Sequence, residues 1–98
     1  MTNPFSSRGT VLDRQLTTLK YPEARVIVLD DNFNTFKHVV NCLLKIIPWM
    51  TEEKALEHAR KIDQEGSAIV WTGPVEQAEL YHLQLTNEGL TMAPLEKG

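Results

Sequence analysis

The most constraining feature of the sequence is a short apolar run that stops abruptly at polar residues. Residues 26–29 read Val-Ile-Val-Leu and are followed by Asp30, Asp31 and Asn32. β-Branched residues favour a buried strand. Asp and Asn favour a turn, because their side chains hydrogen-bond to the nearby backbone. The pattern predicts a buried strand with a polar exit turn, and such a turn is either simply solvated or lines a cleft.

Two helices are predicted after this turn. Asn34 or Thr35 can cap the first helix, in which apolar residues recur at spacings of three and four as far as residue 47. Pro48 ends that helix, and Thr51, followed by two acidic residues, opens the second. The apolar stripe of the second helix consists of Ala55, Leu56, Ala59 and Ile62. Each helix therefore has one face suited to a core.

The rest of the chain alternates strand and helix. Gly66 is placed to end the second helix in a left-handed conformation, and the apolar residues 68–71 predict a second strand. Gly73 and Pro74 start a third helix, which Gly89 ends before a last strand at residues 90–95. The order βααβαβ predicts an α+β fold with helices against a small sheet. Residues 1–24 lack a sustained period, so we expect a flexible N-terminal extension and a single core domain at residues 25–98.

Size and charge exclude several classes of protein. The chain of 98 residues suits one domain. It has 10 Lys and Arg against 13 Asp and Glu, a net charge of -3 and no basic run, so we expect no nucleic-acid partner. The longest mostly apolar stretch, residues 39–50, is too short to span a membrane. A single cysteine and the lack of a leader pattern predict a cytoplasmic location.

The sequence contains no pattern of an active site or a metal site. It has no P-loop, dinucleotide fingerprint or Cys-x-x-Cys pair. His38 and Cys42 lie one helical turn apart, but two ligands do not make a metal site. We therefore expect a protein that is not an enzyme and that holds no cofactor and no metal.

Asp63 departs from the local rules for a helix. It lies in the last turn of the second predicted helix, where an acidic side chain opposes the negative end of the helix dipole. One interpretation is an exposed acid balanced by Arg60 and Lys61. The other interpretation is that Asp63 and Asp30 converge on one small cavity and hold a cation.

Together these features resemble the ClpS family. The resemblance rests on the strand at residues 26–29, the turn at 30–34, the helix pair, Gly66, the strand at 68–71 and the ending Leu95, Glu96, Lys97. Residues 46–48 and 89–91 are most similar to its cyanobacterial and plastid branch. The resemblance implies a three-stranded antiparallel sheet packed against three helices. It also implies a non-enzymatic adaptor that binds an N-degron, the free N-terminus of a protein starting with a bulky hydrophobic residue.

The resemblance also implies the partner and the site for the substrate's α-amino group. The partner is the N-terminal domain of a Clp AAA+ unfoldase of ClpC or ClpA type, which passes substrates to its peptidase. The resemblance assigns the trio Asp30, Asn32 and Asp63 to the amine and includes Asp31 of the same turn in the amine site, while Asn34 contacts the substrate backbone. Asp63 replaces the family's His, so the trio carries two negative charges where the family has one. A free α-amino group has a pKa of about 8, and an ammonium bonds strongly to carboxylates.

A hydrophobic pocket for the first side chain is implied beside the amine site. Its residues here are Phe36, Val39, Ala59, Ile62 and Thr91. Phe36 replaces a flexible Met, and Ala59 stands where a Met is common, so the pocket is expected to be shifted in shape. We expect Leu as the preferred first residue, with Phe, Tyr and Trp as alternatives.

Other functions remain open at this point. The chain could be a ClpS-like domain that modulates the unfoldase without reading N-termini, or a regulatory module that binds a small cationic metabolite. A third alternative is a hydrolase that uses two carboxylates. It would turn over a substrate, whereas a binding protein would not. N-acetylated peptides and free amino acids distinguish the binding alternatives. A protein that recognises free N-termini does not bind the acetylated peptides.

Overall fold

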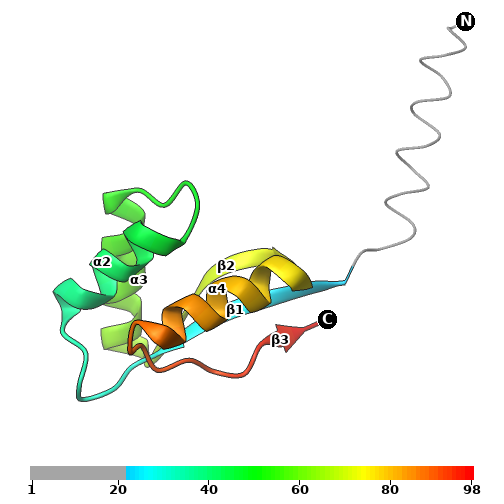
Figure 1. The fold of residues 1–98 in the computed structure, drawn as a ribbon. Helices are drawn as coiled ribbons and strands as arrows, with labels where there is room; N and C mark the ends of the chain where they lie inside the picture. The colour runs from blue at the N-terminus through cyan, green and yellow to red at the C-terminus, as the bar shows by residue number, and fades with distance from the viewer. Residues whose placement is uncertain (1–21) are drawn as a thin grey trace, which may run out of the picture.

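The computed structural model describes residues 22–98, and the extension expected at the N-terminus lies almost wholly outside this range. The elements follow the order β1 (Glu23–Leu29), α2 (Phe36–Ile46), α3 (Glu52–Glu65), β2 (Ser67–Pro74), α4 (Val75–Asn87) and β3 (Glu96–Lys97). Figure 1 shows the α2–α3 pair at one end of a narrow sheet, with α4 running along the strands. The expected βααβαβ order and α+β class are confirmed.

The sheet is antiparallel throughout, with β1 in the centre and β2 and β3 at its two edges. Val26 pairs with Trp71 and Ile27 with Ile69, so Val70 is an extra residue that forms a bulge in β2. The inward side chains of β1 are fully buried at Val26 and Val28. The apolar run therefore forms the central strand, as its composition predicts.

Both predicted helix caps in the first half of the chain are present. The hydroxyl of Thr35 accepts a hydrogen bond from the backbone N–H of His38, and that of Thr51 accepts one from Lys54. At the end of α3, Gly66 has φ 93°, a left-handed conformation that glycine adopts without strain. The Thr35 cap fixes the start of α2 and Gly66 fixes the end of α3, and these two ends border the turn after β1.

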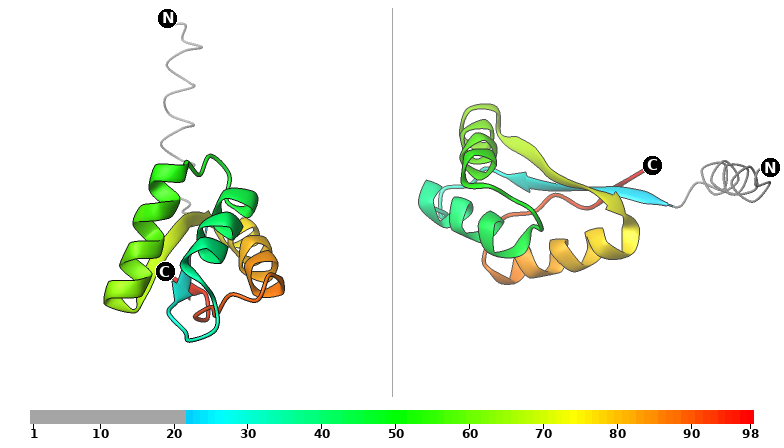
Figure 2. Two further views of the ribbon diagram at one scale, coloured as in Figure 1. Left: turned by 90° about the vertical axis from the view of Figure 1, so that its left-hand side faces the viewer. Right: turned by 90° about the horizontal axis from the view of Figure 1, so that it is seen from above.

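The helices build one core on the sheet. α3 packs against β2, α4 packs against β1 and β2, and α2 contacts both α3 and α4 (Figure 2). Leu43 of α2 and Leu85 of α4 are fully buried among the strand residues. Gly73 is buried because the Trp71 ring occupies the space of its missing side chain, and that ring meets Tyr81 of α4 edge-on at a centroid distance of 4.9 Å. This packing holds the first turns of α4 against β2.

The predictions of the chain ends were wrong in two details. β1 begins at Glu23, and Ala24 is fully buried, so residues 23 and 24 belong to the sheet and not to an extension. The last strand was expected at residues 90–95, but β3 contains only Glu96 and Lys97. Pro94 interrupts the stretch before it, because proline has no N–H to donate to a strand.

Candidate functional site

The exit of β1 is held between two other parts of the chain by backbone hydrogen bonds. The N–H of Asp30 donates to the carbonyl of Gly66 at 2.9 Å, which joins the exit to the end of α3. The N–H of Leu29 donates to the carbonyl of Thr91 at 2.8 Å. Since Gly66 caps the helix that carries Asp63 in its last turn, these bonds place Asp30 beside that turn.

Asp31 organises the turn from within. Its Oδ1 accepts hydrogen bonds from the backbone N–H groups of Phe33, at 2.9 Å, and Asn34, at 2.7 Å. Its Oδ2 accepts from the side-chain amide of Asn34 and from the hydroxyl of Thr91, both at 2.6 Å. These bonds, above all those from the Asn34 backbone and the Thr91 hydroxyl, hold the pKa of Asp31 well below its usual range. The carboxylate is therefore ionised and already occupied by the loop itself.

Asn34 ties the same turn to the segment after α4. Its side-chain N–H₂ group donates to Asp31 and, at 2.9 Å, to the carbonyl of Gly89. An amide has two N–H donors and one carbonyl acceptor, so the Nδ2 donors are used while the oxygen stays available as an acceptor. An oxygen in this position is suited to accept an N–H from a bound peptide.

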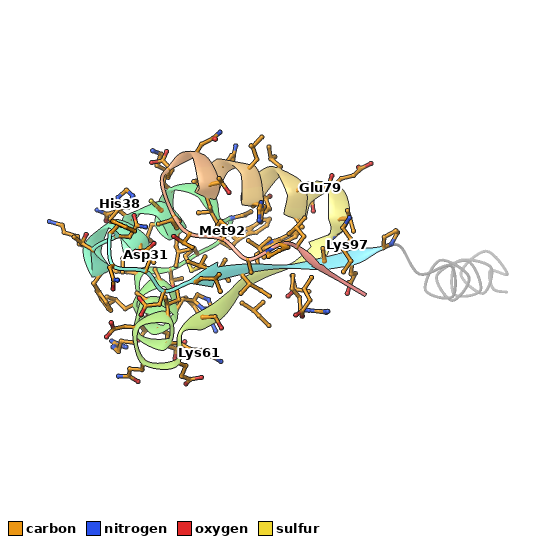
Figure 3. All side chains as sticks on the ribbon, turned by 90° about the horizontal axis from the view of Figure 1, so that it is seen from below. Asp31, His38, Lys61, Glu79, Met92 and Lys97 are labelled. Atoms are coloured by element: carbon orange, nitrogen blue, oxygen red, sulfur yellow. The ribbon has the colours of Figure 1, made fainter. Side chains whose placement is uncertain are left out.

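Two carboxylates beside this turn have no cation. Asp30 and Asp63 are both exposed, as is Asn32. The ion pairs within residues 22–98 are Arg25–Glu96, Lys45–Glu88 and Lys54–Glu57, and they involve neither Asp30 nor Asp63. Asp31 lies at this exit in Figure 3, and Lys61 lies on α3. Among residues 22–98 the site thus has acceptor groups facing solvent and no positive partner within 4.0 Å, which suits an ammonium ligand.

The apolar residues expected in the pocket fall into two groups. Val39 of α2 and Ala59 and Ile62 of α3 are buried in the hydrophobic core. Phe36, at the start of α2, is 43% exposed. Phe36 lies one helical turn before Val39 on α2 and is the accessible apolar member of the predicted set.

Thr91 has a polar role that was not predicted from the sequence. We expected it in the wall of the pocket, but its hydroxyl binds Asp31 and its carbonyl binds Leu29. The segment that contains it is also fixed to α2, because Nε2 of His38 donates to the carbonyl of Glu88 at 2.9 Å and Lys45 pairs with the Glu88 carboxylate at 2.8 Å. No local pattern in the sequence signals these contacts, since the residues joined by the three side-chain contacts lie 43 to 60 positions apart.

The described residues contain neither a metal cluster nor a membrane-spanning helix. Within residues 22–98, no three His, Cys, Asp or Glu side chains lie together as metal ligands would. In the same range, every helix is too short or too polar to cross a bilayer.

Comparisons with known proteins find a matching family and several similar sequences. The model of one protein family, described as "ATP-dependent Clp protease adaptor protein ClpS", matches residues 20–96. The ATP-dependent Clp protease adapter protein ClpS of Synechocystis sp. (strain ATCC 27184 / PCC 6803 / Kazusa) is 60% identical over 87 residues, covering 87% of this chain and 89% of that protein. The corresponding protein of Thermosynechococcus vestitus is 59% identical over 83 residues, covering 85% and 88%. The chloroplastic adapter CLPS1 of Arabidopsis thaliana is 38% identical over 69 residues, covering 70% and 43%.

Proposed function

Because this chain belongs to the ClpS family of Clp protease adaptors, we propose that it binds the free N-terminus of substrate proteins that begin with a bulky hydrophobic residue. It then delivers these proteins to a Clp unfoldase and its peptidase for degradation. The resemblance seen in the sequence is confirmed, and the chain is an adaptor and not an enzyme. The observation that supports the proposed binding mode is a pair of exposed carboxylates, Asp30 at the exit of β1 and Asp63 in the last turn of α3, which form no ion pair within residues 22–98.

The substrate's ammonium is proposed to bind among Asp30, Asn32 and Asp63. Asp30 is fixed beside the last turn of α3 by its backbone bond to Gly66. An ammonium has three donors, and charge-assisted hydrogen bonds to carboxylates are stronger than neutral ones. A bound cation would also explain why an acidic residue stands at position 63, because the cation would offset the unfavourable interaction of the carboxylate with the negative end of the helix dipole. The trio therefore favours a free N-terminus over a blocked one.

Asp31 was also predicted to contact the ammonium, but its hydrogen bonds favour a different contribution. All four bonds that it accepts come from the loop and from Thr91, so it holds the loop in one conformation. Asn34 is proposed to accept an N–H from the substrate backbone through its carbonyl oxygen. The two residues together would position the first peptide unit of the substrate.

The first side chain of the substrate is proposed to pack against Phe36 at the start of α2. Phe36 is partly exposed, whereas Val39, Ala59 and Ile62 are buried in the core and are proposed to form the inner wall of the pocket. A bulky side chain reaches this inner wall only if the Phe36 ring rotates aside, so Phe36 would act as the gate of the pocket. A branched aliphatic side chain such as Leu needs less of this space than Trp does.

Fluorescence anisotropy with matched peptides tests the proposed function. Labelled peptides starting with Leu, Phe, Tyr, Trp, Val or Ala are compared, each with a free and with an acetylated N-terminus. We expect binding that needs both a bulky first residue and a free amine. Equal binding of acetylated peptides would instead indicate a domain that does not read N-termini, and competition by free cationic metabolites would favour a regulatory module.

A matched pair of variants assigns the amine site. Loss of one partner of a buried charge pair costs roughly 2–5 kcal/mol, so for this exposed site we expect a loss just below that range, about 1.4 kcal/mol or tenfold in affinity, for Asp63→Ala. Glu65→Ala removes an exposed acid from the same helix end and serves as the control. Equal effects of the two variants would show that Asp63 acts only through the general charge of this surface.

The partner and the location follow as further proposals. A Clp chaperone or protease is the partner that the family implies, and we propose specifically the N-terminal domain of a ClpC- or ClpA-type AAA+ unfoldase in the cytoplasm. Residues 1–20 are proposed to take part in the transfer of the substrate to the unfoldase. Their deletion should leave peptide affinity unchanged and abolish degradation of a model substrate by the reconstituted protease. Loss of peptide binding on deletion would contradict the separation of the two roles.

A further inference from the structure

A second surface, beyond the proposed N-terminus site, lies along the free edge of the sheet. A groove of about 290 Å³ runs between the α2–α3 connection, the first turns of α3 and residues 69–72 of β2. Its lining consists of Ile47, Pro48, Trp49, Met50, Lys54, His58 and these four strand residues. Figure 1 shows β2 at the margin of the sheet with the α2–α3 connection above it, and the side view in Figure 2 agrees.

Trp49 is the most unusual residue of this groove. Its side chain is 94% exposed, and its backbone has φ 58°. Apart from glycines, it is the only residue in the described range, 22–98, with a positive φ. The left-handed conformation is unfavourable for a tryptophan, and exposure of the whole indole adds a further cost in water. The backbone of Trp49 belongs to a turn with Pro48, which the N–H of Met50 closes by donating to the carbonyl of Ile47 at 3.3 Å, and this turn holds the indole out in solvent, where a partner can contact it.

The strand that forms one wall of the groove lacks the usual protection of an edge. β2 is an outer strand of the sheet, so its outward N–H and C=O groups have no partner strand among residues 22–98. Its eight residues include no charged side chain, although charges commonly prevent edge strands from pairing with other chains. Ile69 is 47% exposed on this strand. The edge can therefore accept an added strand, with Trp49 and Ile69 beside it as apolar contacts.

The charge of the groove indicates what kind of strand it accepts. Lys54 and His58 are its ionisable lining residues, and no acidic side chain lines it. Glu57 lies next to it and approaches Lys54 at 4.0 Å, but both side chains are about two-thirds exposed, which makes that pair weak. Burial lowers the pKa of His58, so Lys54 supplies the positive charge at neutral pH. A partner with a carboxylate opposite Lys54 is complementary to this groove.

We propose that the edge of β2 binds an extended segment of a partner protein by strand addition, with an apolar side chain against Trp49 and Ile69 and a carboxylate near Lys54. The occupied surface is separate from the proposed amine site. Lys54 and Asp63 are nine residues apart on α3, which corresponds to about 13 Å along the helix axis. A protein could thus occupy the groove while a substrate N-terminus is bound at the other end of α3.

The test uses a defined peptide as the probe. Its seven residues alternate valine with glutamate, and both ends are blocked so that the N-terminus site cannot bind it. Titration into the isotopically labelled full-length protein is followed by NMR, with the Trp49 indole and the amides of Ile69 and Thr72 as reporters. We expect these signals to shift on binding. A matched peptide that alternates valine with lysine should bind about threefold to fivefold more weakly, the range of one exposed charge pair.

Two controls separate strand addition from general charge attraction. N-methylation of alternate peptide bonds in the probe removes the hydrogen bonds of the added strand without altering the protein, and it should abolish the shifts. Lys54→Glu should reverse the preference between the two peptides, whereas Lys61→Glu, on the exposed side of the same helix, should not.

Several results would overturn the proposal. One is the absence of shifts with either peptide, and another is binding that N-methylation leaves intact. A preference that Lys54→Glu and Lys61→Glu change equally would remove the role of Lys54. A concentration-dependent dimer that broadens the same signals without peptide would assign the edge to a second copy of the chain. Each result can be obtained whether or not the protein binds free N-termini, so failure here is distinct from failure of the proposed function.

Discussion

Replacement of Asp31 by alanine is the perturbation that best tests the account of the site. The substitution removes four hydrogen bonds, two from backbone N–H groups, one from the Asn34 amide and one from the Thr91 hydroxyl. A hydrogen bond contributes a net stabilisation of roughly 0.5–1.5 kcal/mol, and the lower end of that range suits a partly exposed turn. For four such bonds we expect the free energy of unfolding to fall by about 2 kcal/mol. For a domain of this size, that corresponds to a fall in Tm of roughly 10 °C.

The assay is thermal and urea unfolding followed by circular dichroism. Asp63→Ala is the matched control, because it also removes one negative charge from the same end of the molecule but takes part in no ion pair of residues 22–98. We expect the control to change stability by less than about 0.5 kcal/mol. If Asp31→Ala were no more damaging than Asp63→Ala, the hydrogen-bonded cluster would not be what holds the exit of β1.

The pH dependence gives an independent check of the same residue. Hydrogen bonds lower the pKa of Asp31 in the folded state, so its stabilising contribution is complete above the ordinary Asp pKa of about 4. The contribution is lost as the pH falls below that value. The difference in unfolding free energy between the parent and Asp31→Ala should therefore narrow between about pH 5 and about pH 2. A difference that is constant over this range would mean that the ionised form is not the one that accepts the bonds.

Further substitutions test other parts of the structure. Gly73→Ala places a methyl group where the Trp71 ring lies, so we expect a loss of roughly 1–3 kcal/mol and an altered near-UV signal from the Trp71–Tyr81 pair; an unchanged spectrum would contradict this packing. In Gly66→Ala the added methyl group meets no neighbouring atom, but alanine is strained at φ 93°. Urea unfolding should therefore show a fall of about 1 kcal/mol in the free energy of unfolding. An unchanged value would mean that α3 can end without a left-handed residue. Phe36→Met should broaden the range of first residues bound in the anisotropy assay, because a thioether chain adapts its shape, and an unchanged range would contradict the gate.

Most of the fold could be predicted because its signals are local. Thr35 and Thr51 cap their helices through contacts three residues apart, and Gly66 ends α3 through its own backbone conformation. The buried strand and the helix stripes follow from the spacing of apolar residues. The short β3 could not be found in this way, because Glu96 and Lys97 pair with Arg25 and Ala24 far away in the sequence.

The candidate site was only partly predictable for the same reason. The polar exit turn and the unusual Asp63 are visible in the sequence, and the resemblance to the ClpS family assigns them a ligand. The cluster of Asp31, Asn34, Gly89 and Thr91 is not visible, because its members are brought together only by the tertiary fold. The residues proposed to face a ligand are therefore easier to predict from the sequence than the residues that hold the loop in place.

The ties at the exit of β1 have a consequence for how tightly this loop can bind. The turn is fastened to Gly66 on one side and to Gly89 and Thr91 on the other, so its backbone is ordered when the domain folds and not when a ligand arrives. Little conformational entropy is then lost on association, and a small contact area can give useful affinity. The same coupling restricts evolution and engineering of this region. A substitution at residues 89–91, which need never contact a ligand, would loosen the loop and weaken binding through increased disorder of the free protein.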